Sequence, residues 1–248
     1  MSGRQITFLD QWPTAAFGVE LPISRERIAL GVIDMQHYCI SPEGHLARAL
    51  HMQCPEIYEA YSKRVDDITV NIGRLLSVFR ERQSHVFYTR HGSLLPEAED
   101  MILRRRNRER MARVATDGEA DHMPLQGTRG HEIIPALAPL PGELILDKNT
   151  SSTFHSTSID LFLRNMEVDT LVLTGLAADM CVFTTALDAA DRGFHVILAS
   201  DGCTTLDPGM SEATQILFGR VFGYVMQTRD IIDWLTTGNE PTRVRLED

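Results

Sequence analysis

The chain has 248 residues, of which 43% are hydrophobic and 23% charged, and its formal net charge is −10. This composition is typical of a globular protein with a sizeable core, and we expect one domain over residues 1–248. A chain this acidic is a poor candidate for binding phosphate backbones, so we expect no nucleic-acid partner. The first residues lack the apolar segment of a secretory signal, and no apolar run approaches the ~20 residues of a membrane span. We therefore expect a cytoplasmic protein with no membrane partner.

The predicted elements alternate between strands and helices along the chain. Short apolar runs predict six strands, at residues 27–34, 85–90, 143–148, 171–174, 194–200 and 223–228. Apolar residues at helical spacing predict helices at residues 63–83, 159–163, 178–191, 208–222 and 229–235, the second of them capped by Thr157 or Ser158. Because the strands are apolar throughout, both faces of the sheet should be covered. The sequence therefore predicts an α/β fold with three α-β-α layers and a six-stranded, mainly parallel sheet.

A polar stretch at about residues 91–142 interrupts this alternation and is a candidate insertion. It contains the segment ILRRRNRERMAR, residues 102–113, with six arginines. These arginines could form a solvated helix face or contact another subunit. Alternatively, they could belong to a lid that attracts an anionic substrate. The sequence leaves these interpretations open.

The four cysteines are Cys39, Cys54, Cys181 and Cys203. They form neither a C-x-x-C metal pattern nor a dense disulfide framework, so we expect reduced thiols. Cys181 stands where a predicted buried strand is followed by a helix. Open parallel sheets bind ligands at such junctions, so this thiol is a candidate nucleophile.

Three chemically reactive side chains fall at predicted strand ends. Asp34 ends the first strand, Lys148 ends the third, and Cys181 follows the fourth. The carboxyl ends of parallel strands share one edge, so we expect these residues to lie together. The thiolate is the attacking form of cysteine, an ammonium stabilises it, and a carboxylate can carry the proton to a leaving amine. Each residue alone also has a structural interpretation, as a turn cap, a solvated lysine or a small buried side chain.

Three segments resemble the isochorismatase-like cysteine hydrolases. They are VIDMQ around Asp34, DKNTSSTF around Lys148, and TGLAADMCVFTTALDAADRGFHVILASDGC around Cys181. The resemblance covers residues 27–236 and implies a six-stranded parallel sheet. It also implies that Asp34, Lys148 and Cys181 act as a catalytic triad.

The resemblance makes a further statement about the backbone before the cysteine. It implies a cis peptide bond between Leu176 and Ala177, although neither residue is proline. The backbone amides of Ala177 and Cys181 would then form an oxyanion hole. Such donors stabilise the charge that develops in the transition state by about 3–4 kcal/mol each.

The chain departs from its relatives at several points. Many relatives carry Thr where this chain has Ala178. The zinc nicotinamidases of the family have an Asp-x-His motif, whereas the corresponding segment here offers only His91, so we expect neither a metal nor another cofactor. True isochorismatases lack the nucleophilic cysteine, and its presence here favours acyl transfer.

Three further segments, FYTRHGS, RGHEIIPALAPLPGELILDK and TSSTF, look most like the branch that includes biuret, ureidoacrylate and N-carbamoylsarcosine amidohydrolases. This resemblance implies hydrolysis of a small linear amide or ureido compound through an acyl-thioester, with release of ammonia. Gln36, Arg90 and Phe154 lie just beyond predicted strands and are candidates to line the pocket, although turn and packing roles are equally compatible. A nicotinamidase and a catalytically silent binding or redox-sensing protein are the alternatives. Relatives also imply a homodimer or homotetramer.

Overall fold

The computed structural model describes residues 21–107 and 124–239. Within these ranges six strands form one sheet in the order β3-β2-β1-β4-β5-β6, and all pairs are parallel. The strands are β1 Ile28–Ile33, β2 His85–His91, β3 Leu144–Lys148, β4 Thr170–Leu176, β5 His195–Thr204 and β6 Tyr224–Met226. Each predicted strand overlaps an observed one, so the predicted α/β class and parallel sheet are confirmed.

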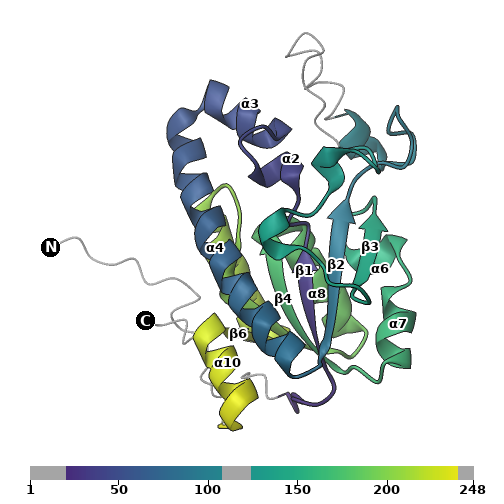
Figure 1. Ribbon diagram of the computed structural model, residues 1–248, viewed down its shortest axis with the longest axis vertical. Coiled ribbons are helices and arrows are strands. Elements are labelled where there is room, and N and C mark those ends of the chain that lie inside the picture. The colour runs from purple at the N-terminus through teal and green to yellow at the C-terminus, as the bar shows by residue number, and fades with distance from the viewer. Residues whose placement is uncertain (1–20, 108–123, 240–248) are drawn as a thin grey trace, which may run out of the picture.

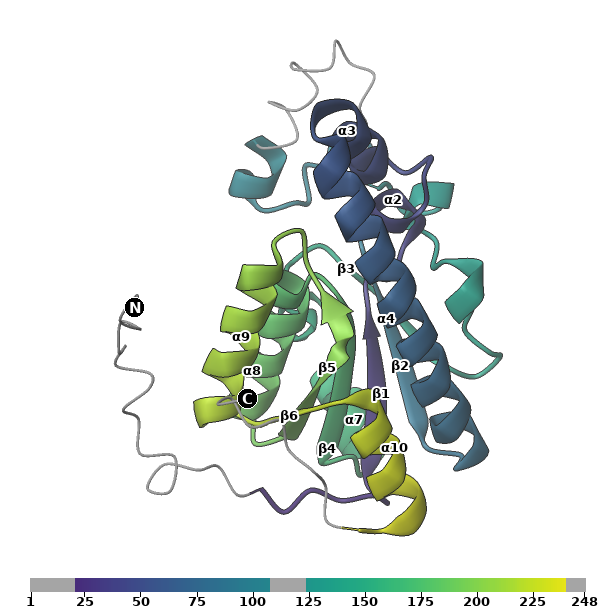
Figure 2. The same ribbon diagram turned by 90° about the vertical axis from the view of Figure 1, so that its left-hand side faces the viewer.

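Helices cover both faces of this sheet (Figure 1). They are α2 His37–Ile40, α3 His45–Gln53, α4 Pro55–Glu81, α6 Thr153–Ser156, α7 Ile159–Asn165, α8 Phe183–Asp191, α9 Pro208–Val221 and α10 Thr228–Thr237. Figure 2 shows α4 and α10 against one face, and α8 and α9 against the other. The molecule therefore has the predicted three α-β-α layers. None of its helices in the described ranges combines the length and apolar character needed to cross a bilayer.

The central strand β1 packs into two separate cores. Leu30 and Val32 belong to the apolar cluster beneath α4, whereas Ala29 and Ile33 belong to the cluster beneath α8. Both faces of β1 are thus buried, which explains why its sequence is a continuous apolar run. The predicted apolar stripe of α4 faces the first core, through Val65, Ile68, Ile72, Leu75, Leu76 and Phe79.

The helices α2, α3 and α6 were not predicted, and two predicted helices begin at other residues. The helix α4 begins at Pro55 rather than at residue 63, and its first turns are largely exposed, so no apolar stripe marks them. Residues 178–182 form a single π-helical turn, and the α-helix starts only at Phe183. Apolar periodicity does not distinguish a π-helical turn from an α-helical one, although π-turns are frequent at functional sites.

The region between β2 and β3 is mostly irregular where the structure describes it. Residues 124–142 contain two 3-10 turns, Arg129–His131 and Pro135–Leu137. Of the arginine-rich segment 102–113, residues 103–107 are helical, whereas residues 108–113 lie outside the described ranges. Figures 1 and 2 both show the segment before residue 107 above the carboxyl ends of the strands.

Candidate active site

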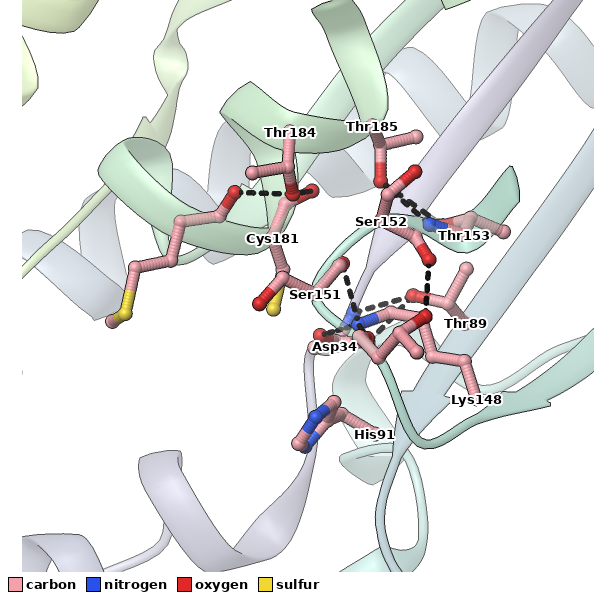
Figure 3. Close-up of polar contacts among 12 residues, drawn as sticks. Asp34, Thr89, His91, Lys148, Ser151, Ser152, Thr153, Cys181, Thr184 and Thr185 are labelled. Carbon is pink, nitrogen blue, oxygen red and sulfur yellow. Dashed lines mark hydrogen bonds and ion pairs between the residues drawn. The ribbon is translucent and has the colours of Figure 1, made fainter. Parts of the chain in front are cut away.

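Four neighbouring strands end side by side at the edge of the sheet where the carboxyl ends of the strands meet. In spatial order, Lys148 ends β3, Thr89 lies near the end of β2, Asp34 follows β1, and Cys181 follows β4. The chain order reverses between β1 and β4, and such a switch point is where open α/β sheets bind ligands. The three residues predicted from the sequence, Asp34, Lys148 and Cys181, meet here (Figure 3).

Lys148 and Asp34 form a buried ion pair. The lysine Nζ lies 2.7 Å from Asp34 Oδ2, and both residues are 2% exposed. Nζ also donates to the carbonyl oxygens of Thr150 at 3.2 Å and Ser151 at 3.1 Å. Burial lowers the pKa of Lys148, but the charge of Asp34 and the neighbouring Cys181 outweigh this effect and raise it. Lys148 is therefore an ammonium at neutral pH.

Asp34 is held from its other side by Thr89. The threonine hydroxyl donates to Asp34 Oδ1 at 2.6 Å. The backbone amide of Asp34 points back at the same residue and lies 3.2 Å from both the carbonyl oxygen and Oγ1 of Thr89. Asp34 has a φ of 51°, in the left-handed region that residues other than glycine rarely adopt. This conformation ends β1 and fixes the carboxylate between a hydroxyl and an ammonium.

A close approach of β4 to β1 sets the position of the segment before Cys181. Gly175 pairs with Ile33, has a φ of 108°, and would place a Cβ 2.1 Å from the Ile33 carbonyl oxygen. Only glycine fits this position. The peptide bond between Leu176 and Ala177 is cis, which confirms the expectation from the resemblance.

The π-helical turn then presents the cysteine. Met180 and Val182 donate their amides to the carbonyl oxygen of Ala177, at 3.0 and 3.2 Å. Cys181 lies between these two donors and is 5% exposed. Its own amide is not among the donors to that carbonyl.

The Cys181 thiol is protonated at neutral pH. Burial raises its pKa to about 11; Lys148 opposes this rise, and the charge of Asp34 together with a hydrogen bond to its side chain reinforces it. Burial thus outweighs the stabilisation that the Lys148 ammonium gives to the thiolate. The site instead holds a neutral thiol beside an Asp–Lys ion pair, and Asp34 is the base that the thiol proton can reach.

The loop after Lys148 is fastened to the helix after Cys181. The amide of Thr153 donates to Thr185 Oγ1 at 3.1 Å, and the two hydroxyls are also 3.1 Å apart. Ser152 caps α6 by accepting from the amide of Phe154 at 3.2 Å. The hydroxyl-rich sequence NTSSTF thus has a local explanation, since its carbonyls receive Lys148 and its side chains hold the loop in place.

Two of the predicted pocket residues, Gln36 and Phe154, make buried contacts within the protein. Gln36 is fully buried, and its Nε2 donates to the carbonyls of His91 at 3.2 Å and His131 at 2.9 Å. Its Oε1 accepts from the amide of His91 at 2.8 Å. Phe154 is 8% exposed and packs in the second core, with its ring centroid 5.9 Å from that of Phe194. These contacts position the backbone and fill the core.

Arg90, the third predicted pocket residue, forms a two-point ion pair with Asp147. Its Nε lies 2.7 Å from Oδ1, and its Nη2 lies 3.0 Å from Oδ2. Side chains alternate along a strand, so Arg90 points to the face opposite Thr89 and His91. Each of the three pocket candidates thus has contacts within the protein, and a role in substrate binding stays a prediction.

His91, which ends β2, and Tyr38, in α2, are two further side chains near this site. His91 is 1% exposed, and neither ring nitrogen has a hydrogen-bond partner within residues 21–107 and 124–239. Burial, followed by the charges of Lys148 and Arg105, lowers its pKa well below 6.5, so its ring is neutral. Burial also raises the pKa of Tyr38, and the neighbouring charges of Cys39, Asp34 and Cys181 raise it further. In the part of the chain that the structure describes, no group of three or more His, Cys, Asp or Glu side chains could hold a metal.

Comparison with known proteins gives consistent results. The model of the isochorismatase domain matches residues 29–230. The crystal structure of a cysteine hydrolase from Pseudomonas syringae pv. phaseolicola 1448A matches with a TM-score of 0.73 at 28% identity, over 88% of this chain and 97% of that one. Nicotinamidase 3 of Arabidopsis thaliana is 26% identical over 166 residues, which are 67% of this chain and 78% of that protein.

Two curated amidohydrolases match a shorter segment. N-carbamoylsarcosine amidase of Arthrobacter sp is 33% identical over 104 residues, and ureidoacrylate amidohydrolase RutB of Methylorubrum extorquens is 34% identical over 101 residues. These segments are 42% and 40% of this chain. They span only 39% and 41% of the two relatives.

Proposed function

This chain belongs to the isochorismatase family, and we propose that it is a cysteine-dependent amidohydrolase. Its substrate is a small linear amide or ureido compound, from which it releases ammonia. The observation that carries the proposal is the buried Asp34–Lys148 ion pair beside the thiol of Cys181. The names of two relatives, N-carbamoylsarcosine amidase and ureidoacrylate amidohydrolase, support cleavage of a carbon–nitrogen bond.

The first half of the reaction forms a thioester. Asp34 accepts the thiol proton while Cys181 Sγ attacks the carbonyl carbon of the amide. The proton then passes from Asp34 to the nitrogen, the carbon–nitrogen bond breaks, and ammonia leaves. Lys148 pairs with Asp34 before the attack and lowers the free energy of the developing thiolate, which explains why a protonated thiol can serve as the nucleophile.

The second half hydrolyses the thioester. Asp34 is again a carboxylate, and it deprotonates a water molecule that attacks the acyl carbon. The carbon–sulfur bond breaks, the thiol regains a proton from Asp34, and a carboxylic acid leaves. The hydrogen bond from Thr89 holds Asp34 in one orientation through both halves.

The developing negative charge on the carbonyl oxygen needs hydrogen-bond donors in both halves. We assign this role to the backbone amides of Ala177 and Cys181. The support for this assignment is that the carbonyl oxygen of Ala177 accepts from the amides of Met180 and Val182 and not from the amide of Cys181, which lies between them. Preorganised donors of this kind are the largest single contribution in many acyl-transfer enzymes.

An ammonia-release screen tests the proposal. The screen compares biuret, triuret, ureidoacrylate, N-carbamoyl amino acids, maleamate and nicotinamide, with the wild-type protein, Cys181→Ser and Cys54→Ser. Cys54 is an exposed free cysteine far in sequence from the site and is the matched control. We expect ammonia from at least one ureido or linear amide compound, loss of release in Cys181→Ser, and full release in Cys54→Ser. Turnover of nicotinamide alone would instead favour a nicotinamidase, and no turnover would contradict the proposal.

A further inference from the structure

Arg105 is a positive charge beside the nucleophile that the reaction described above does not use. It is half-buried, and its guanidinium makes no hydrogen bond or ion pair with any residue within 21–107 and 124–239. Its charge acts on Tyr38, His91 and Cys181. These three groups belong to α2, β2 and the π-turn at the carboxyl ends of the strands, above which the segment before residue 107 lies (Figures 1 and 2).

The segment that carries Arg105 is fastened to the active-site loop. Asp100 accepts from Ser93 Oγ at 2.7 Å and from the amide of Leu94 at 2.9 Å. Its carbonyl accepts from Asn149 Nδ2 at 3.0 Å, and Asn149 directly follows Lys148. The amide of Arg105 then donates to the carbonyl of Ile102 at 2.9 Å, within the turn that leads into the helical residues 103–107. The contact between Asp100 and Asn149 thus holds the backbone a few residues before Arg105, next to Lys148.

Two other cationic side chains at this end of the sheet, Lys148 and Arg90, are already in ion pairs. Lys148 is paired with Asp34, and Arg90 is paired with Asp147 on the opposite face. The His91 ring is neutral. Of the three charged side chains with the largest effect on the Cys181 thiol, Lys148 and Asp34 are paired with each other, and Arg105 is the third.

We propose that Arg105 binds a carboxylate of the substrate, so that the amide to be hydrolysed is one end of a small amide or ureido acid. The inference rests on the proposed function, because it takes Cys181 as the nucleophile. A guanidinium presents parallel N–H donors that match the two oxygens of a carboxylate, and that of Arg105 has no contact to break with the residues described in 21–107 and 124–239. Arg105 would then select substrates by charge and hold them over the thiol.

Two thiol reagents that differ by one carboxylate test the proposal without knowledge of the substrate. Iodoacetate and iodoacetamide alkylate the same sulfur, but only iodoacetate is an anion. The ratio of their rates at Cys181, measured at one fixed pH by peptide mass spectrometry, therefore isolates the effect of charge from the thiol pKa. We expect Arg105→Gln to lower this ratio about tenfold, as a charge–charge contact near a protein surface allows, and Arg105→Lys to lower it less.

Arg104→Gln is the matched control, because Arg104 is the neighbouring arginine and is exposed. It should leave the ratio unchanged, and raised salt should reduce the preference of the wild-type protein for iodoacetate. An Arg105→Gln ratio equal to that of the wild type would overturn the proposal. An equal fall in Arg104→Gln would also overturn it, because the effect would then come from the general charge of the segment.

Steady-state kinetics separate this proposal from the proposed function. N-carbamoylglycine and biuret are the two probes, one with a carboxylate and one without. We expect Arg105→Gln to lower kcat/KM for N-carbamoylglycine about 10- to 100-fold, mainly through KM, and to change that for biuret little. Equal losses on both compounds would overturn the role of Arg105 and leave the amidohydrolase intact. No turnover of any amide, with an alkylation ratio that still depends on Arg105, would contradict the amidohydrolase and leave the anion site.

Discussion

Lys148 Nζ lies 2.7 Å from Asp34 Oδ2, and both side chains are almost completely shielded from solvent. Taking two charges out of water is expensive, and a buried ion pair often stabilises a fold no better than apolar side chains would. Here the remaining hydrogen-bonding groups are satisfied by Thr89 and by the carbonyls of Thr150 and Ser151. The pair is better explained by the chemistry proposed for Cys181, beside which it places the Asp34 side chain.

Lys148→Met should be strongly destabilising, because it leaves the Asp34 carboxylate buried without its ammonium. We expect the free energy of unfolding to fall by about 3–5 kcal/mol, measured by urea denaturation. The double variant with Asp34→Asn should lose less than the sum of the single losses, because it removes both charges. Lys63→Met is the control, since Lys63 is an exposed lysine of α4 and should change the free energy by less than about 0.5 kcal/mol. A loss in Lys148→Met no larger than the control's would contradict the ion pair.

The alkylation rate of Cys181 by iodoacetamide should rise with pH towards a midpoint of about 11. The thiol ionises only above its usual range, because burial disfavours the charged form. Removal of the ammonium in Lys148→Met should move the midpoint higher still, since Lys148 favours the thiolate. The measurement uses the Cys54→Ser background, in which the exposed thiol is absent. A wild-type midpoint at or below the free value of about 8.5 would show that the site holds a resident thiolate.

Thr89→Val should lower kcat while leaving the fold intact. Valine has nearly the shape of threonine but cannot donate to Asp34 Oδ1, so the carboxylate loses one of its two fixed contacts. A hydrogen bond to a charged group contributes about 1.5–3 kcal/mol, which corresponds to a fall of roughly 10- to 100-fold. Thr89→Ser keeps the hydroxyl and should retain most of the rate. Equal rates for the valine and serine variants would mean that this hydrogen bond does not orient the base.

The position of the candidate triad could be predicted because it depends on strand ends alone. Apolar runs locate the ends of β1 and β3 and the start of the segment after β4, and parallel pairing then brings Asp34, Lys148 and Cys181 to one edge. The predicted pocket residues depend on the face of the sheet to which each side chain points, which the position of a strand end does not determine. The sequence places Arg90 at the end of β2, whereas in the structure its neighbour Thr89 points at Asp34. Alternation along the strand, applied from Lys148 and its register partner His91, could have separated the two.

Arg105 could not be singled out from the sequence. It stands in a run of arginines, and its position depends on the contact between Asp100 and Asn149, which are 49 residues apart in the chain. The sequence also does not predict the pKa of the Cys181 thiol, because the opposing effects of burial and Lys148 can be compared only when the depth of Cys181 is known. Tertiary contacts therefore decide the details of the pocket, and strand order decides the location of the site.

Gln36→Ala should destabilise the protein through the backbone. The side chain bridges the backbone of His91 and the carbonyl of His131, and all its partners are buried. Its loss leaves three buried polar groups unpaired, so we expect the free energy of unfolding to fall by about 2–4 kcal/mol in urea denaturation. Gln126→Ala, which removes an exposed side-chain amide that contacts Asp147, is the control and should change the free energy little. If Gln36→Ala were as stable as the wild type but had a raised KM, Gln36 would be a substrate contact after all.

The mass of the acyl-enzyme tests the central claim most directly. A slowly deacylating amide is mixed with the protein, the reaction is quenched with acid, and the digested peptides are analysed by mass spectrometry. We predict that the peptide containing Cys181 gains the mass of the acyl fragment without the ammonia, and that Cys54→Ser shows the same adduct. Cys181→Ser should show no such gain, because a serine hydroxyl ionises far less readily than a thiol and is a weaker nucleophile. An adduct on another residue, or undiminished turnover by Cys181→Ser, would contradict the account.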